Sequence, residues 1–257
     1  MSGTFTPKPG AAPLHQQVLA QSRMEARLML RNGEQLLLAV VIPVIVLIGG
    51  VQAADHIDLS LSHRPVDVFT PGVLALAIMS TAFTSLAIAT GFERRYGVIK
   101  RLGASPLPRS GLLMGKIGGL LVVELMQIVV IGAVGVALGW EPHGSMAAVT
   151  GSVLALLLGT FAFASLGLFL AGVLRAEATL AAANLVYLLL MAGGAVVLPA
   201  DAYGSAGSAL TWLPSGALGE AMRTALIDGH LAGGSLVVLA AWGAFGTILT
   251  ARTFTWE

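Results

Sequence analysis

The amino-acid sequence predicts an all-α integral membrane protein with six transmembrane helices. Hydrophobic residues make up 56% of the 257 residues and charged residues only 11%, against roughly 25% charged residues in an ordinary soluble domain. The mean hydropathy is +0.86, and apolar runs near the length of about twenty residues that crosses a bilayer recur along the chain. We therefore expect a six-span transmembrane domain over residues 35–257, preceded by a cytoplasmic segment over residues 1–34.

The N-terminal segment combines a tail with an arginine-striped helix. Three prolines and two glycines within residues 1–13 predict a flexible tail. In residues 14–32, Arg23, Arg27 and Arg31 recur every fourth position, which places them on one helical stripe. This pattern predicts an amphipathic helix on the membrane surface, with its arginines among lipid phosphates. Because the apolar stripe is short, a solvated helix with a few charges is the alternative.

Six apolar segments follow, each near or above the length that a bilayer requires. They comprise residues 35–53, 71–91, 112–138, 146–173, 179–198 and 233–251. Pro43 predicts a kink in the first segment, because proline lacks the N–H that the helical ladder uses. The third and fourth segments exceed the minimum length, so we expect them to tilt or to extend beyond the bilayer.

Orientation is predicted from the distribution of lysine and arginine. With a cytoplasmic N-terminus, twelve of the fourteen basic residues lie inside, and only Arg64 and Arg223 lie outside. By the positive-inside rule this bias places both termini in the cytoplasm. We expect a multi-pass protein of the plasma (inner) membrane. The inside set is Lys8, Arg23, Arg27, Arg31, Arg94, Arg95, Lys100, Arg101, Arg109, Lys116, Arg175 and Arg252.

The loop between the second and third spans predicts a short helix. Thr90 and Glu93 have the spacing of a capping box, and Lys100 and Arg101 fall in the last turn, where the helix dipole favours cations. Gly103 is suited to end the helix. The basic residues alone are also explained if the loop only sets the topology and contacts anionic lipid.

This loop resembles the signature loop of the type-2 ABC exporter permeases, a family that includes drug, polysaccharide and lipid exporters. The resemblance rests on Glu93, Arg94, Arg95, Tyr96, Gly97, Val98, Ile99, Lys100, Arg101 and Leu102, followed by Pro106 to Ser110 and by Gly115 and Lys116. It implies that the loop is a coupling helix that docks on a separate ATP-binding subunit. It further implies that ATP and magnesium are bound by that partner and that the permease pairs with a second copy or a homologous permease.

A second part of the resemblance lies between the fifth and sixth spans. In residues 210–229, Pro214 precedes a helix start at Ser215, and Leu218, Met222 and Ala225 share one helical face. The resemblance implies short helices that re-enter the outer leaflet. An ordinary amphipathic external loop is the alternative.

The sequence contains no nucleotide-binding loop of the G-x-x-x-x-G-K-[ST] type. The nearest string, residues 111–117, has the wrong spacing, and we expect its Lys116 to snorkel at the membrane entrance. The five histidines show no metal-binding spacing. We therefore expect no catalytic, cofactor or metal site in this chain. A nucleic-acid role is disfavoured because topology already explains the basic patch.

Glu124 is the one clearly intramembrane acidic residue of the predicted spans. Gln127 can share its helical face, and Asn184 in the fifth span is a candidate third member of a polar patch. One interpretation is a structural contact between helices or subunits, because a polar group in the membrane needs a partner. The other is a substrate path that receives a cationic group or exchanges a proton.

These features favour an exporter permease that moves an amphiphilic, drug-like or lipid-like substrate outward and is driven by a partner ATPase. An ATP-independent secondary transporter or channel is an alternative, which would carry charged residues along several spans. A membrane scaffold that uses the basic loop only for docking is another. ATPase stimulation by substrate separates the scaffold from the exporter.

The topology is testable because the chain contains no cysteine. We expect single cysteines in place of Ser62, Gly144 and Ser205 to react with an impermeant reagent added to intact cells. Cysteines in place of Ser105 and Ala176 are expected to stay unlabelled until the cells are opened. Labelling of Ser105→Cys in intact cells would overturn the predicted orientation.

Overall fold

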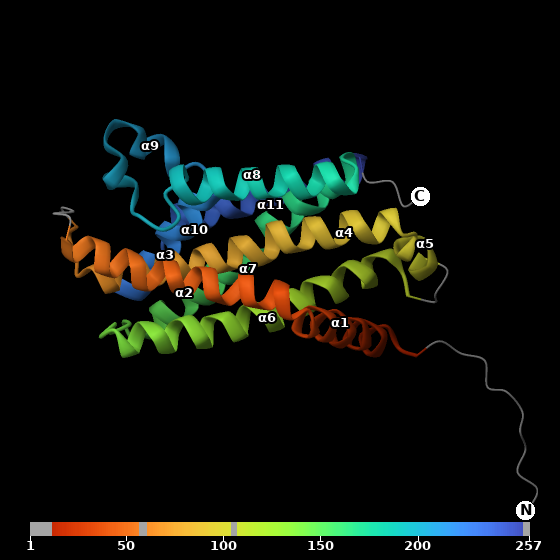
Figure 1. Ribbon diagram of the computed structural model, residues 1–257, viewed down its shortest axis with the longest axis horizontal. Coiled ribbons are helices and arrows are strands. Elements are labelled where there is room, and N and C mark those ends of the chain that lie inside the picture. The colour runs from red at the N-terminus through yellow and green to blue at the C-terminus, as the bar shows by residue number, and fades with distance from the viewer. Residues whose placement is uncertain (1–11, 57–60, 104–106, 254–257) are drawn as a thin grey trace, which may run out of the picture.

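The computed structural model describes residues 12–56, 61–103 and 107–253, which form an elongated bundle of helices along one axis (Figure 1). None of these residues forms a β-strand. Five helices are long and apolar enough to cross a membrane: Pro65–Arg95, Ser110–Ala137, Met146–Val173, Ala176–Gly193 and Gly233–Thr253. The all-α membrane class is confirmed. The tail predicted over residues 1–13 falls almost wholly outside the described residues.

The described helices follow one another with short connections. In chain order they are α1 (Leu14–Arg31), α2 (Gly33–His56), α3 (Pro65–Met79), the π-helix η1 (Ser80–Ser85), α4 (Leu86–Arg95), α5 (Val98–Gly103), α6 (Arg109–Ala137), α7 (Met146–Val173), α8 (Ala176–Gly193), the 3-10 helix η2 (Ala200–Ala206), α9 (Gly207–Leu210), α10 (Pro214–Arg223), the π-helix η3 (Thr224–Asp228) and α11 (Gly233–Thr253).

Five of the six predicted spans coincide with helices of membrane-crossing length. The first predicted span, residues 35–53, falls on α2, whose described apolar part, Ala39–Ala54, is shorter than the other five. The fourth span matches α7 at both ends. Its start is marked by Ser145, whose hydroxyl oxygen accepts a hydrogen bond from the backbone N–H of Ala148 at 3.0 Å, as a helix N-cap does.

Two predicted spans differ from the structure by more than three residues at an end. The second was expected over residues 71–91, but α3, η1 and α4 form a continuous helix over Pro65–Arg95. Pro65 occupies the first turn, where a missing N–H is tolerated. The fifth was expected to reach residue 198, but α8 ends at Gly193. The chain leaves the helix there and passes into the interior as an irregular segment.

The continuous helix over Pro65–Arg95, here called the central helix, is the most buried of the five helices of membrane-crossing length. Its apolar window is 78% buried, and it packs against α2, α6, α7, α8 and α10. Tight packing continues through the π-helix, because a Cβ on Gly167 of α7 would lie 2.8 Å from the Phe83 carbonyl oxygen. The central helix therefore contacts helices from nearly every other part of the chain.

Helix α1 lies alongside one half of α6 (Figure 1). It is helical where predicted, but the side it turns to the protein is polar: Gln21 and Glu25 are buried. Leu14 and Leu28 on its apolar side are 50% and 59% exposed. This arrangement suits a helix whose apolar side faces lipid.

Glycines of α6 make this contact possible. A Cβ at Gly115, Gly118 or Gly119 would lie 2.3 to 2.6 Å from side-chain atoms of α1. These small residues therefore let the two helices approach closely.

Replacing Gly119 with valine should separate α1 from α6. Its added Cβ would lie 2.6 Å from the Glu25 Cβ and 3.1 Å from the Ala26 backbone nitrogen, so no flexible side-chain end can yield. We expect the free energy of unfolding to fall by about 1–3 kcal/mol, as overpacking generally causes. Thermal unfolding in detergent measures this loss.

The matched control is Gly49→Val in α2, where an added Cβ meets nothing within 4 Å. It changes the same residue type within a helix without touching the α1–α6 contact. Equal melting temperatures for the two variants would contradict the role assigned to Gly119.

Candidate functional site

The loop predicted to be one capped helix is instead the end of the central helix, a turn and a short helix. The central helix continues through Arg95, so Thr90 is buried inside it and caps no helix start. Gly97 has a φ of 68°, a left-handed conformation that glycine adopts without strain. α5 follows over Val98–Gly103. Glu93 consequently lies near a helix C-terminus rather than in a first turn.

Three consecutive side chains at this helix end bind three other helices. A carboxylate oxygen of Glu93 lies 2.7 Å from the ammonium nitrogen of Lys116 in α6. Arg94 Nη1 donates hydrogen bonds of 2.6 Å to the Ala171 and Gly172 carbonyls, near the C-terminus of α7. Arg95 forms an ion pair with Glu177 in the first turn of α8. These contacts connect the end of the central helix to α6, α7 and α8.

Lys116 belongs to a buried polar cluster with Gln21, Glu25 and Glu93. Its ammonium nitrogen also lies 3.1 Å from a carboxylate oxygen of Glu25, which accepts a second hydrogen bond of 2.8 Å from Gln21 Nε2. The Lys116 side chain is 4% exposed. The prediction that Lys116 snorkels to the membrane surface is therefore wrong, because two carboxylates hold its charge inside the protein.

The exposed part of the predicted coupling segment is smaller than the predicted set. Tyr96 is 62% exposed, and Lys100 and Arg101 are also exposed. Gly97, Val98 and Leu102 are half-buried. Ile99, by contrast, is 3% exposed and anchors α5 to the bundle. Arg95, which pairs with Glu177, is 50% exposed as well. A partner protein approaching this end therefore meets an aromatic ring and three cations.

A second polar site lies in the middle of the bundle. Glu124 is fully buried, and its Oε2 accepts a hydrogen bond of 2.7 Å from Thr160 in α7. Gln127 Oε1 accepts from Thr81 in η1 at 2.9 Å, and its Nε2 donates to the Ala39 carbonyl in α2 at 2.8 Å. These contacts join α6 to three other helices.

Asn184, the third predicted member of that patch, is exposed on α8. The structure thus places Glu124 and Gln127 on the same stretch of α6 but does not bring Asn184 to them within this chain. Sequence spacing related the first two residues correctly because they are three positions apart on one helix. No comparable local signal relates residues on different helices.

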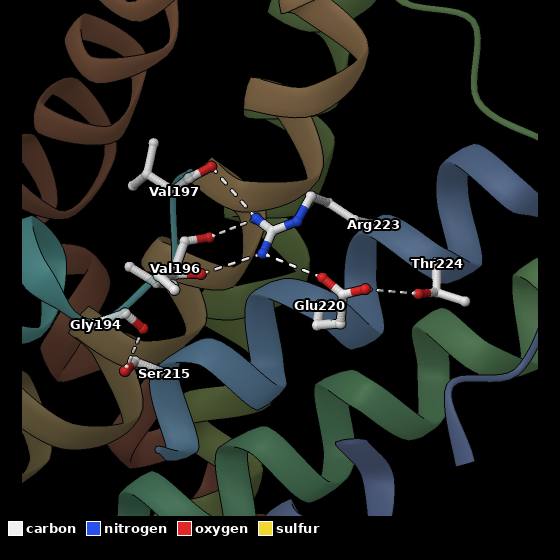
Figure 2. Close-up of polar contacts among 8 residues, drawn as sticks. Gly194, Val196, Val197, Ser215, Glu220, Arg223 and Thr224 are labelled. Atoms are coloured by element: carbon white, nitrogen blue, oxygen red, sulfur yellow. Dashed lines mark hydrogen bonds and ion pairs between the residues drawn. The ribbon is translucent and has the colours of Figure 1, made fainter. Parts of the chain in front are cut away.

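At the opposite end of the bundle, Arg223 holds the irregular segment that follows α8 (Figure 2). Its guanidinium donates hydrogen bonds to the carbonyls of Val196 at 3.0 Å, Val197 at 3.3 Å and Ala195 at 3.1 Å. Ser215 donates a fourth hydrogen bond to the Gly194 carbonyl at 2.8 Å. Four successive carbonyls that no helix satisfies are thereby paired in the interior.

The Arg223 side chain is 6% exposed and lies 3.6 Å from a carboxylate oxygen of Glu220. Burial lowers the pKa of the Arg223 guanidinium, and the Glu220 carboxylate opposes this shift, but arginine keeps its charge in proteins. Sequence reasoning missed this site. The available signal was that Arg223 is one of only two basic residues on the predicted outer side.

Helix α10 begins at Pro214, one residue before the predicted start at Ser215. Leu218, Met222 and Ala225 are all buried, so the predicted shared face is correct. That face contacts α3, α7 and α11 rather than forming an isolated external loop helix.

The described residues contain no group of three or more histidine, aspartate or glutamate side chains that could hold a metal ion. The three polar sites instead make contacts between helices. Their side chains pair with buried charges and backbone carbonyls. The exposed side chains of the α5 turn are instead available to contact a partner protein.

Replacing Lys116 with methionine keeps the length of the side chain but leaves Glu25 and Glu93 without their shared cation. We expect the free energy of unfolding to fall by about 3–5 kcal/mol, as it does when one partner of a buried ion pair is removed. Denaturation in mild detergent measures the loss. Lys100→Met, at an exposed position, is the control.

The triple variant Glu25→Gln/Glu93→Gln/Lys116→Met removes the unpaired charges as well. It should regain most of the stability that Lys116→Met loses, because the amides are neutral. If the triple variant were no more stable than Lys116→Met alone, the loss would not come from unpaired charge.

A family model described as "ABC-2 family transporter protein" matches residues 59–252, which is 194 of the 257 residues. No curated protein matches the chain. The matched region includes the central helix, the α5 turn, the buried site around Glu124 and the Arg223 site. The chain therefore belongs to the ABC-2 transporter family and is a multi-pass membrane permease of the ABC type.

Proposed function

We propose that this chain is the transmembrane subunit of an ATP-driven exporter, powered by a separate ATP-binding subunit that docks on the turn around α5. The family assigns an ABC-type permease, and the sequence carries no nucleotide-binding loop of its own. ATP and magnesium then belong to the partner subunit. This chain contributes the docking surface and the membrane path.

The observation that carries the proposal is the combination of exposed and buried side chains at residues 93–102. Tyr96, Lys100 and Arg101 are exposed. Glu93 and Arg94, just before this turn, connect it to α6 and α7 through buried and half-buried contacts. A force applied by a partner at α5 would therefore act on the whole bundle, because packed interiors transmit displacement.

The proposed assembly has six spans, with α2 as the first. α2 contains 24 residues, which at 1.5 Å per residue extend about 36 Å and exceed the hydrocarbon core of about 30 Å. The basic bias supports cytoplasmic termini in the plasma membrane. We further propose that two such subunits, identical or homologous, form the complete transport path, because six spans resemble half of the usual assembly.

The proposed substrate is amphiphilic, drug-like or lipid-like. Charged side chains are sparse in the spans, and Glu124 is fully buried. A pocket of about 280 Å³ between α6, α7 and α11 is lined mainly by apolar side chains, including Leu113, Phe161 and Leu168, with hydroxyls from Ser165 and Thr250. Such a lining fits hydrocarbon with few polar groups.

The alternatives receive no specific support from the geometry. A secondary transporter or channel would present charged groups along a path, whereas Glu124 is bonded to Thr160 and Gln127 to Thr81 and Ala39 in the interior. These contacts favour the structural interpretation of Glu124 and Gln127. A scaffold would dock a partner without changing its ATPase rate.

The docking proposal is tested with Tyr96→Ala/Lys100→Glu. Both side chains are exposed, so the protein should insert and fold normally. We expect the tagged variant to recover at least tenfold less ATP-binding subunit from native membranes than the wild type, because a recognition surface loses an aromatic anchor and reverses a charge. Quantitative mass spectrometry of the purified complexes measures the ratio.

Trp212→Ala/Arg252→Glu is the matched control, since it also removes one exposed aromatic ring and reverses one exposed cation, elsewhere on the surface. It should retain the partner. Arg94 is unsuitable for this test because its side chain holds the end of α7. Normal recovery of the ATP-binding subunit by Tyr96→Ala/Lys100→Glu would refute docking at this turn.

A further inference from the structure

A groove of about 370 Å³ lies along α1 and reaches Val122 of α6. Its lining combines arginines with apolar side chains and one serine: Leu19, Ser22, Arg23, Ala26, Arg27, Leu30, Arg31 and Val122. Neither the ATP-binding partner nor the central helix uses this surface in the proposed function. Its chemistry therefore calls for a separate explanation.

The three arginines are held on the groove by the packing of α1. Gln21 and Glu25 face the glycines of α6, so α1 cannot rotate without breaking the Glu25–Lys116 ion pair. Among the described side chains, no ion pair neutralises Arg23, Arg27 or Arg31. Three guanidinium groups therefore form a concentrated positive stripe, and planar guanidinium groups match the oxygen geometry of a phosphate.

The apolar part of the groove continues along the outside of α6. Val122 is 45% exposed, and Leu125 and Val129 are 55% and 69% exposed. Their spacing of three and four residues places them on one helical face. A hydrocarbon chain that starts at the groove can follow this face toward the middle of the bundle.

The arginine stripe begins at the depth of a lipid headgroup. Counting back from Ala137, the last residue of α6, a hydrocarbon core of about twenty residues begins near position 118. A Cβ at Gly118 would lie 2.3 Å from Ser22 Oγ, so Arg23 is level with this boundary. Arg27 and Arg31 follow about one and two turns further along α1. Arginine at such a boundary extends its head group toward the phosphates.

We propose that this groove binds one anionic phospholipid from the leaflet on the α5 side of the membrane. Its phosphate contacts Arg23, Arg27 and Arg31, and one acyl chain lies on Val122, Leu125 and Val129. The bound lipid covers the seam between α1 and α6. It thereby stabilises α1 in the position at which Glu25 reaches Lys116.

Native mass spectrometry of the purified protein, titrated with phosphatidylglycerol or phosphatidylcholine, tests the site. The wild type should bind one phosphatidylglycerol more tightly than phosphatidylcholine, and the preference should weaken as salt is raised. Arg23→Gln/Arg27→Gln should reduce the affinity for phosphatidylglycerol about thirtyfold, since each basic residue near a membrane raises the affinity about fivefold. Arg175→Gln/Arg252→Gln, with the same charge change at exposed positions, should bind as the wild type does.

A competition with inorganic phosphate separates a lipid site from a site for free phosphate. Inorganic phosphate is added in excess, and chloride at the same ionic strength serves as the control. The phosphate should leave the bound phosphatidylglycerol in place. Displacement by phosphate beyond that of chloride would overturn the lipid assignment. Equal affinity of the wild type for the two lipids would overturn the proposal without any variant, so a folding defect in Arg23→Gln/Arg27→Gln cannot protect it. These outcomes do not depend on an ATP-binding subunit.

Discussion

The end of the central helix is held by side chains that point in different directions from one short stretch of sequence. Successive residues of an α-helix are rotated by about 100°, so Glu93, Arg94 and Arg95 face three sides. They meet Lys116 of α6, the final carbonyls of α7 and Glu177 of α8. Because Lys116 and the Ala171 and Gly172 backbone are buried, their polar groups need partners from within the protein. The positions of α1, α6, α7 and α8 relative to the α5 turn depend on this stretch.

Features with a local cause could be predicted from the sequence. Apolar length alone located five helices of membrane-crossing length, and a proline near the start of α10 marked its boundary within one residue. The buried face that α10 and η3 share followed from the spacing of Leu218, Met222 and Ala225. These successes share a physical basis, since helix periodicity and proline geometry are set by neighbours along the chain.

Features set by distant partners could not be predicted in the same way. Lys116 is separated from Glu25 by 91 positions, and Arg223 from Ala195 by 28, so neither pairing leaves a mark in local spacing. The capping-box pattern of Thr90 and Glu93 failed because the central helix had already begun at Pro65, and an N-cap residue has to lie outside a helix. For buried polar residues in a membrane, residue type predicts that a partner exists but not which helix supplies it.

The central helix joins the two ends of the molecule at which the chain departs from helical structure. At one end it leads into the α5 turn. At the other, α3 approaches the irregular segment so closely that a Cβ on Gly72 would lie 2.3 Å from the Val197 carbonyl oxygen, the same carbonyl that Arg223 binds. A buried carbonyl that lost this guanidinium would carry a desolvation cost of about 1–3 kcal/mol, so the segment cannot move away from α3 without a replacement donor. The position of the segment is therefore set jointly by the packing of the central helix and by the hydrogen bonds of α10.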